Sequence, residues 1–168
     1  IVVINGELKQ EYIDRLKSLN YEVLVRENKG LDVYAYKHAF DYVGFNNLSE
    51  YDEVVYCNST FFGPIYNLED MFECMDKNED LDFWGITQHP DYKVDNEDIP
   101  AYNINPYGYL PKHIQNYFMV YRNSFVKKKD LYDFWNNLPE INGYFDSVGL
   151  FETVFYNNIE HLYLSRET

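Results

Sequence analysis

The sequence predicts an α/β fold in which helices flank a mostly parallel β-sheet. Two observations support this prediction. Short runs of β-branched and aromatic residues alternate with segments whose apolar residues recur at helical spacing, a pattern typical of βαβ units. The 168 residues suit one compact domain, and no repeat or interdomain linker interrupts them. We therefore expect a single domain over residues 1–168.

Each element follows from a local pattern. Residues 1–4 are β-branched and end at the turn pair Asn5-Gly6, which predicts a buried strand. Residues 11–19 place their apolar side chains at helical spacing. The other predicted elements are, in chain order, a strand over 21–25, a helix over 33–43 with Asp32 as its N-cap, a strand over 51–57, a helix from the N-cap Asn67 to 75, a strand over 82–87, an irregular loop over 89–112, a strand over 114–122, a helix over 124–138 capped by Ser124, and a helix over 148–159.

Charge and cysteine content narrow the possible partners. The chain carries 14 basic and 28 acidic residues, a net charge of −14, which repels nucleic-acid backbones and anionic lipid headgroups. We expect neither as a partner, and no apolar stretch has the length of a membrane span. Cys57 and Cys74 each lie in an apolar run and predict buried free thiols in a reducing cytoplasm. The chain begins with Ile1, so we expect it to be part of a longer protein.

Three polar clusters are expected at one edge of the predicted sheet: Asn5, residues 26–32 and residues 58–60. The carboxyl ends of parallel strands meet at one edge, where ligands of α/β proteins bind. Within 26–32, a strand end, Gly30 and a helix N-terminus present free backbone N–H groups, and Arg26 adds a cation. This arrangement suits a diphosphate or a ribose, although a capped helix with surface charges explains it equally well.

Residues 58–60, the pair His113 and Gln115, and Glu152 are further candidate site residues, and each also has a structural interpretation. Residues 58–60, Asn-Ser-Thr, can bind a ligand, complete a metal shell or form a turn with their own backbone. Strand alternation places His113 and Gln115 on one face, although a lone strand histidine is more often structural. Glu152 lies in an apolar segment, where a carboxylate suits a general base, and the alternative is a helix-surface residue facing solvent.

Taken together, these segments resemble the rhamnan synthesis F family, glycosyltransferase-like proteins of bacterial cell-surface polysaccharide assembly. The matches run in order from about Val2 to about Ile159 and so cover nearly the whole chain. The matching motifs are Arg26-Glu27-Asn28-Lys29-Gly30-Leu31-Asp32, Tyr51-Asp52-Glu53 leading to Asn58-Ser59-Thr60-Phe61-Phe62-Gly63-Pro64, Asp82-Phe83-Trp84-Gly85-Ile86-Thr87, His113-Ile114-Gln115-Asn116-Tyr117-Phe118, Phe134-Trp135 and the region of Glu152.

The resemblance implies a GT-A-like fold with a Rossmann-like nucleotide-binding sheet, here lacking its first strand. It implies a cytoplasmic enzyme, working at the inner face of the cell membrane, that transfers a sugar from a donor such as dTDP-rhamnose to a growing glycan acceptor. Asn28 and Gly30 match the Asn-x-Gly loop beside the nucleotide. Glu152 matches the acidic residue that acts as base in inverting members.

One departure from the family pattern concerns the metal. The strand end that usually carries an Asp-x-Asp metal motif reads Asn58-Ser59-Thr60 here, with Ser59 in place of an Asp. Mg²⁺ or Mn²⁺ would lack its preferred anionic ligand, so the resemblance gives little support for a divalent metal cofactor. Asn116 also stands where the family usually has Ser.

Two hypotheses follow. In the first, the chain is a glycosyltransferase with Glu152 as base, and the loop over 90–111 covers the acceptor. The expected donor-site residues are Asn5, Arg26, Asn28, Gly30, Asp32, Lys37, Asn58, Ser59 and Thr60, and Trp84, His113 and Gln115 would face the sugar or the acceptor. In the second, which Ser59 favours, it is a catalytically silent domain that binds a nucleotide-sugar or a glycan inside a larger assembly protein.

Overall fold

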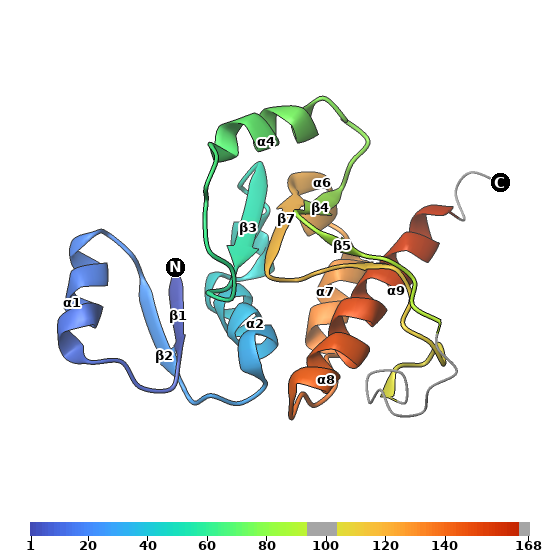
Figure 1. Cartoon of the computed structure of the whole chain (residues 1–168). Coiled ribbons are helices and arrows are strands. Elements are labelled where there is room, and N and C mark those ends of the chain that lie inside the picture. Colours follow the sequence, from blue (N-terminus) through green and yellow to red (C-terminus); the bar gives the residue numbers. More distant parts are fainter. Residues whose placement is uncertain (94–103, 165–168) are drawn as a thin grey trace.

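A computed structural model describes residues 1–93 and 104–164 of the chain (Figure 1). The fold is a mixture of helices and small sheets, as the alternating pattern predicts. No helix in the described ranges is long and apolar enough to cross a membrane. The elements are β1 (Val2–Asn5), α1 (Gln10–Ser18), β2 (Val23–Arg26), α2 (Leu31–Val43), α3 (Phe45–Leu48), β3 (Glu53–Cys57), α4 (Leu68–Asp76), β4 (Phe83–Gly85), β5 (Gln88–His89), β6 (His113–Ile114), β7 (Phe118–Arg122), α6 (Asn123–Val126), α7 (Lys129–Asn136), α8 (Tyr144–Asp146), the π-helix η1 (Ser147–Glu152) and α9 (Thr153–Leu164).

The sheet is not mostly parallel, so that part of the prediction is wrong. Among the strands of the described residues, only β1 and β2 pair in parallel, and they form a two-stranded sheet of their own. In the three-stranded sheet, β7 lies between β3 and β4 and is antiparallel to both. The apolar segment predicted as one strand over 114–122 divides into β6 and β7, and β7 returns into the space between the two earlier strands.

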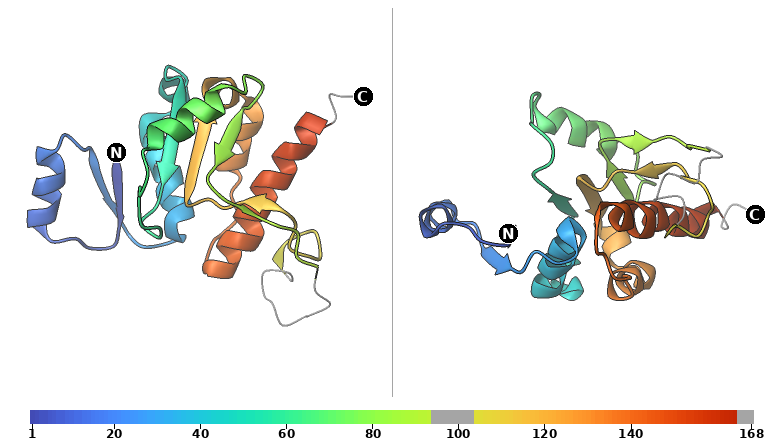
Figure 2. Two further views of the ribbon diagram at one scale, coloured as in Figure 1. Left: turned by 45° about the horizontal axis from the view of Figure 1, so that its top comes forward. Right: turned by 60° about the horizontal axis from the view of Figure 1, so that its bottom comes forward.

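The three-stranded sheet separates two apolar clusters. On one face, Tyr121 and Met119 of β7 contact the main core, which α2, α7 and α9 complete. On the other face, Val120 and Phe118 pack with Trp84 of β4 beneath α4. Figure 2 shows α4 on one side of the sheet and the other three helices on the opposite side. Strand alternation explains this division, because successive side chains of β7 point to opposite faces.

Several local expectations need correction. Asp32 is not the N-cap of α2, because the helix already begins at Leu31 and Gly30 occupies the cap position. Ser124 caps no helix: it lies inside α6, and its hydroxyl donates to the Asp82 carboxylate over 2.6 Å. The predicted cap at Asn67 is confirmed, since its side chain accepts a hydrogen bond from the backbone N–H of Glu69.

The cysteines are exposed rather than buried. Cys74 lies on α4, whose partly buried side chains Met71, Phe72 and Met75 turn toward Trp84, so Cys74 falls on the outer face of that amphipathic helix. Cys57 is the last residue of β3, where the strand leaves the sheet.

The long loop predicted over 89–112 has ordered ends. Strands β5 and β6 pair in antiparallel fashion, and Tyr92 bridges to Leu110 just beyond them. Residues 94–103 of this predicted loop lie outside the described residues. The last predicted helix is confirmed, but its first turns form the π-helix η1, a rare geometry that often occurs at functional sites.

The core contains three buried tyrosines whose pKa values lie above the ordinary range. Burial is the main cause for Tyr36, Tyr56 and Tyr121, and negative charges such as Asp32 add to it for Tyr36. The hydroxyls of Tyr56 and Tyr121 hydrogen-bond each other over 2.9 Å. These phenols therefore remain protonated in the folded state at a pH where an unfolded chain ionises them.

We expect stability to fall steeply above a pH of about 10, the ordinary pKa of tyrosine. A raised folded-state pKa gives stability that is complete below the unfolded pKa and lost as pH rises above it, by about 1.4 kcal/mol per pH unit for each such tyrosine. Urea unfolding between pH 8 and 11 measures this slope. The double variant Tyr56→Phe/Tyr121→Phe should flatten it, whereas Tyr51→Phe/Tyr66→Phe, which changes exposed tyrosines, should not. Equal slopes in both double variants would contradict the assignment.

Candidate functional site

The three polar clusters predicted at one edge are joined by hydrogen bonds. Arg26 at the end of β2 donates to the side-chain oxygen of Asn5 at the end of β1, its partner in the parallel register. Asn5 in turn donates to the backbone oxygen of Leu31 over 3.0 Å. Asn58, just after β3, donates to the carboxylate of Asp32 over 2.6 Å. The segments therefore meet, but the prediction that they lie at the edge of one sheet is wrong, because β1 and β2 form a sheet without β3. We call the place where Asn5, Arg26, Asp32 and Asn58 meet the polar edge.

Residues 58–60 form a turn and do not offer a metal shell. The side-chain oxygen of Asn58 accepts from the backbone N–H of Thr60 over 3.0 Å and from its hydroxyl over 2.6 Å. Its amide nitrogen is bound to Asp32, and exposed Ser59 brings no carboxylate. Within the described ranges, no three His, Cys, Asp or Glu side chains are grouped so that they could hold a metal ion. This donor set does not fit Mg²⁺ or Mn²⁺.

The loop before α2 is built around Gly30. Its φ is +74°, and a Cβ added there would lie 2.2 Å from the ring of Tyr34. Arg26 holds the loop by donating to the backbone oxygen of Lys29 over 2.6 Å. Partial burial lowers the pKa of the Arg26 guanidinium, and the charge of Glu27 acts in the opposite direction and raises it. Asn28 is exposed on the same loop. The loop thus holds a cation and the positive end of a 13-residue helix at one place.

Two predicted site residues are engaged elsewhere. The ammonium of Lys37 lies 3.0 Å from both carboxylate oxygens of Asp41, one turn along the same helix, so Lys37 is not directed at the loop. Trp84 is only 3% exposed and packs against Phe72 and Phe118 beneath α4, on the other face of the sheet from the core helices. It is a core residue, and the prediction that it faces a sugar is wrong.

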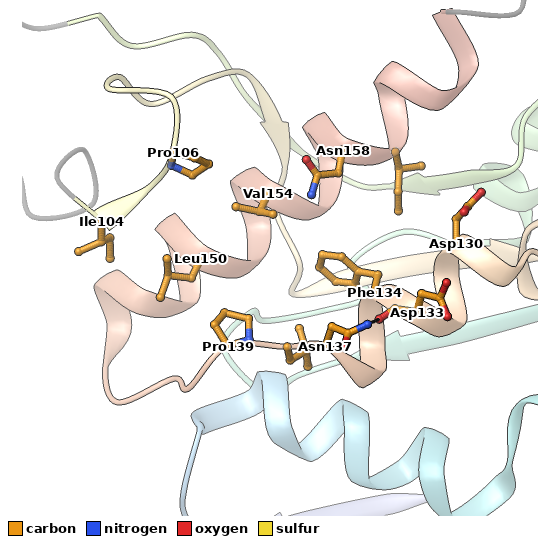
Figure 3. Close-up of a pocket in the computed structure, with 12 residues that line it drawn as sticks. Ile104, Pro106, Asp130, Asp133, Phe134, Asn137, Pro139, Leu150, Val154 and Asn158 are labelled. Carbon is orange, nitrogen blue, oxygen red and sulfur yellow. Dashed lines mark hydrogen bonds between the residues drawn. The ribbon is translucent and has the colours of Figure 1, made fainter.

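A cavity of about 590 Å³ lies away from this edge, between α7 and the η1–α9 helix (Figure 3). Its walls are mostly apolar, with Phe134 from α7 facing Leu150 and Val154. Sequence patterns did not indicate it, because each helix separately reads as an ordinary amphipathic helix. The cavity is distinct from the polar edge, and none of the residues that form that edge lines it.

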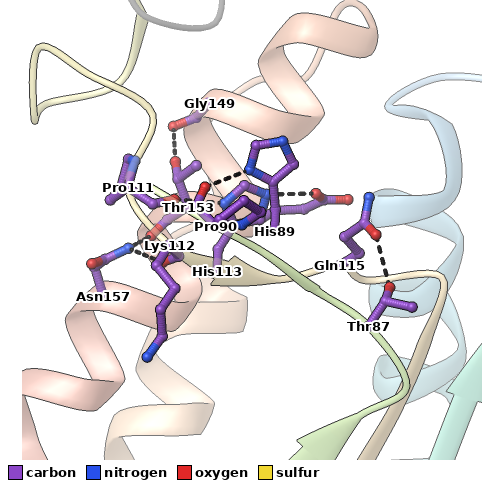
Figure 4. Close-up of polar contacts among 11 residues, drawn as sticks. Thr87, His89, Pro90, Pro111, Lys112, His113, Gln115, Gly149, Thr153 and Asn157 are labelled. Carbon is purple, nitrogen blue, oxygen red and sulfur yellow. Dashed lines mark hydrogen bonds and ion pairs between the residues drawn. The ribbon is translucent and has the colours of Figure 1, made fainter. Parts of the chain in front are cut away.

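Glu152 lies beside His113 inside the protein. The Glu152 side chain is 12% exposed, and one of its oxygens is 3.5 Å from Nε2 of His113, whose side chain is 2% exposed. The other ring nitrogen, Nδ1, lies 2.8 Å from the backbone oxygen of Pro111, which can only accept, so Nδ1 carries a proton (Figure 4). Nε2, on the opposite side of the ring, faces the Glu152 carboxylate.

A second histidine, His89, lies at this pair and was not among the predicted site residues. The ring of His89 stacks on that of His113, with centroids 5.1 Å apart and planes at 10° (Figure 4). The pairing of β5 with β6 places the two residues opposite each other, and this pairing has no local sequence signal. Because His113 is buried, it contacts Glu152 and not a sugar directly, which corrects its predicted role.

The Glu152 pair and the polar edge are neighbours. Tyr36 of α2 donates from its hydroxyl to the backbone oxygen of Asn116 over 3.3 Å. The pKa of Tyr36 is raised first by burial and then by the charges of Asp32, Cys57 and Glu152. Tyr36 follows Asp32 by four residues, so helical spacing alone could have indicated that they share a face.

Residues 115–116 border the same region. The Thr87 hydroxyl donates to the side-chain oxygen of Gln115 over 2.7 Å (Figure 4), so Gln115 lies near the histidines but is already engaged. Asn116 is 6% exposed, and its side-chain nitrogen has no hydrogen-bond partner within the described part of the chain. A buried amide donor of this kind is costly unless a ligand or water satisfies it.

The family model of rhamnan synthesis protein F matches residues 1–162. The chain belongs to the rhamnan synthesis protein F family. Searches of curated proteins and of solved structures gave no significant match. Membership of the rhamnan synthesis protein F family gives the chain a role in the synthesis of rhamnan polysaccharide, and sugar donors and acceptors are the partners that such a role involves.

We expect Gly30→Ala to destabilise the protein by about 1–3 kcal/mol, since it forces an alanine into the left-handed region against the Tyr34 ring. Gly143→Ala is the matched control, because Gly143 has an extended φ of −166° and open space around it. Chemical denaturation of both variants measures the difference. An equally small loss for both would show that the loop conformation does not require glycine.

Proposed function

We propose that the chain is an inverting glycosyltransferase that transfers a sugar from a nucleotide-sugar, dTDP-rhamnose, to a glycan acceptor at the cytoplasmic face of the cell membrane. One observation carries the proposal: a nearly buried carboxylate, Glu152, lies 3.5 Å from a histidine whose ring is held by the backbone oxygen of Pro111, and close to the polar edge. Buried carboxylates paired in this way are typical of general bases. The family's role in rhamnan synthesis supplies the substrate class.

The polar edge suits the diphosphate of the donor. Arg26 provides a positive charge, and the N-terminus of α2 provides the positive end of its dipole and the backbone N–H groups that precede Val33, whose own N–H is bound by the Asp32 carboxylate over 3.0 Å. These local features oppose the overall charge of −14. Asn5, Asp32 and Asn58 hold the edge in shape through their hydrogen bonds, and exposed Asn28 and Ser59 remain available to a ligand.

The chemical step is a single displacement. The acceptor hydroxyl oxygen forms a bond to the anomeric carbon as the bond from that carbon to the diphosphate oxygen breaks, and the nucleoside diphosphate leaves with the electron pair. Ionised Glu152 takes the hydroxyl proton. His113, held by Pro111, positions the carboxylate. Developing charge on the leaving diphosphate meets Arg26 and the α2 N-terminus, so no step in this scheme passes through a metal ion.

A second candidate is a catalytically silent domain that binds a nucleotide-sugar or a glycan. The observation that favours it is the turn at Asn58. The side-chain nitrogen of Asn58 donates to Asp32 and its side-chain oxygen accepts from Thr60, while Ser59 stands where the family usually has an Asp. A silent domain that binds a nucleotide-sugar shares the donor site of the transferase and differs from it only in turnover.

Glu152→Gln should reduce sugar transfer by about 10²–10⁴-fold, the usual contribution of a general base. Because the substitution preserves shape, binding of dTDP should change little. The rate of transfer from dTDP-rhamnose to a rhamnan acceptor, measured as released dTDP, gives the effect. Glu73→Gln, on the exposed face of α4, is the matched control. Full activity in Glu152→Gln would exclude the base role, and an inactive wild type that still binds dTDP would favour the silent domain.

We expect dTDP to raise the melting temperature of the wild type equally with and without Mn²⁺, because binding to the native state stabilises it by mass action. Ser59→Asp restores a carboxylate beside the turn and should make the shift larger when Mn²⁺ is present. A thermal-shift series over both proteins compares them. A wild-type shift that appears only with Mn²⁺ would contradict the metal-independent site.

A further inference from the structure

We propose that the cavity between α7 and the η1–α9 helix is a second site, which binds an uncharged stretch of glycan away from the donor. The proposal rests on the family's role in rhamnan synthesis and does not depend on Glu152 acting as a base. The cavity has a volume of about 590 Å³, within the range of about 300–1,000 Å³ that is usual for ligand pockets.

The cavity and Glu152 lie on opposite sides of one helix. Leu150, Val154 and Asn158 recur every four residues and all line the cavity (Figure 3). Glu152 is two residues from both Leu150 and Val154, about half a helical turn away. Its carboxylate faces His113 instead. A ligand in the cavity therefore cannot reach the catalytic pair, and a ligand at the pair leaves the cavity open.

The charge of the cavity excludes the nucleotide donor. Asp130 and Asp133 of α7 line it, and none of the described lining residues is basic. Asp133 forms an ion pair with Lys129, which partly neutralises its charge. Asp130 forms no hydrogen bond or ion pair with any other described residue. Two carboxylates in a lining that contributes no basic side chain repel a diphosphate. The ligand is therefore neutral or cationic.

The lining combines the two features that a sugar ring needs. Phe134, Leu150 and Val154 offer apolar surface to the C–H faces of a ring. Asp130 and Asn137 offer side-chain oxygens to its hydroxyl groups. A purely apolar ligand would leave these side-chain oxygens without a hydrogen bond from the ligand, and the family's role in polysaccharide synthesis favours a glycan over a small cation. A neutral glycan uses both parts of the lining.

Such a site suits an enzyme of polymer synthesis. A glycan held on one side of the η1–α9 helix remains close to the protein between additions, which raises the effective concentration of its growing end. The cavity would then act through retention of the polymer and not through the chemical step.

The test uses the whole chain with isotope-labelled methyl groups and a rhamnose trisaccharide as probe. We expect saturable shifts of the Leu150 and Val154 methyl resonances, and no shift of them with dTDP. Asp130→Ala should weaken trisaccharide binding by about tenfold or more, the expected loss for one hydrogen bond to a charged group. Val154→Phe, which fills the cavity, should weaken it at least as much.

Controls separate this proposal from the proposed transferase activity. Glu73→Ala, an exposed acidic residue of α4, should bind the trisaccharide as the wild type does. Glu152→Gln should also bind it normally while losing transfer. Asp130 is exposed in the first turn of α7, so its removal should leave the melting temperature unchanged. No saturable binding, or binding that is kept in Asp130→Ala and Val154→Phe, would overturn the second site.

Discussion

The antiparallel pairing of β7 with β3 is the constraint on which the rest of the structure depends. Its register places Cys57 opposite Phe118, and the backbone N–H of Asn58 donates to the oxygen of Tyr117 over 3.0 Å. The end of β3 therefore meets the beginning of β7. Without this pairing, the segment that carries His113 and Asn116 would have no reason to lie beside Asn58.

The site then assembles around this meeting point. Tyr36 reaches from α2 to the backbone of Asn116, and the pairing of β5 with β6 stacks two histidines next to it. The π-helix brings Glu152 to His113. Four segments that are distant in sequence thus contribute to one region, and the apolar core behind the sheet fixes their relative positions.

Local patterns in the sequence predicted the elements but not how they pair. The first two strands, α1, α2, β3 and α4 lie close to where periodicity indicates, and the N-cap of α4 is also as predicted, because those signals act over a few residues. The apolar run over 114–122 carries no information on strand direction, so a parallel sheet was expected. The lack of pairing information also explains the wrong prediction for Trp84, because the register of Trp84 with Val120 decides to which face of the sheet it points. For Lys37 the deciding interaction is local: Lys37 forms an ion pair with Asp41, four residues along the same helix, and does not point to the donor loop.

A crystal structure of the protein with bound dTDP tests the central claim most directly, namely that the polar edge and the Glu152 pair form one donor site. The account predicts that the diphosphate contacts Arg26 and the backbone N–H groups at the start of α2, with space for a sugar between it and Glu152. A nucleotide bound in the α7–α9 cavity, or on the α4 face of the sheet, would contradict it.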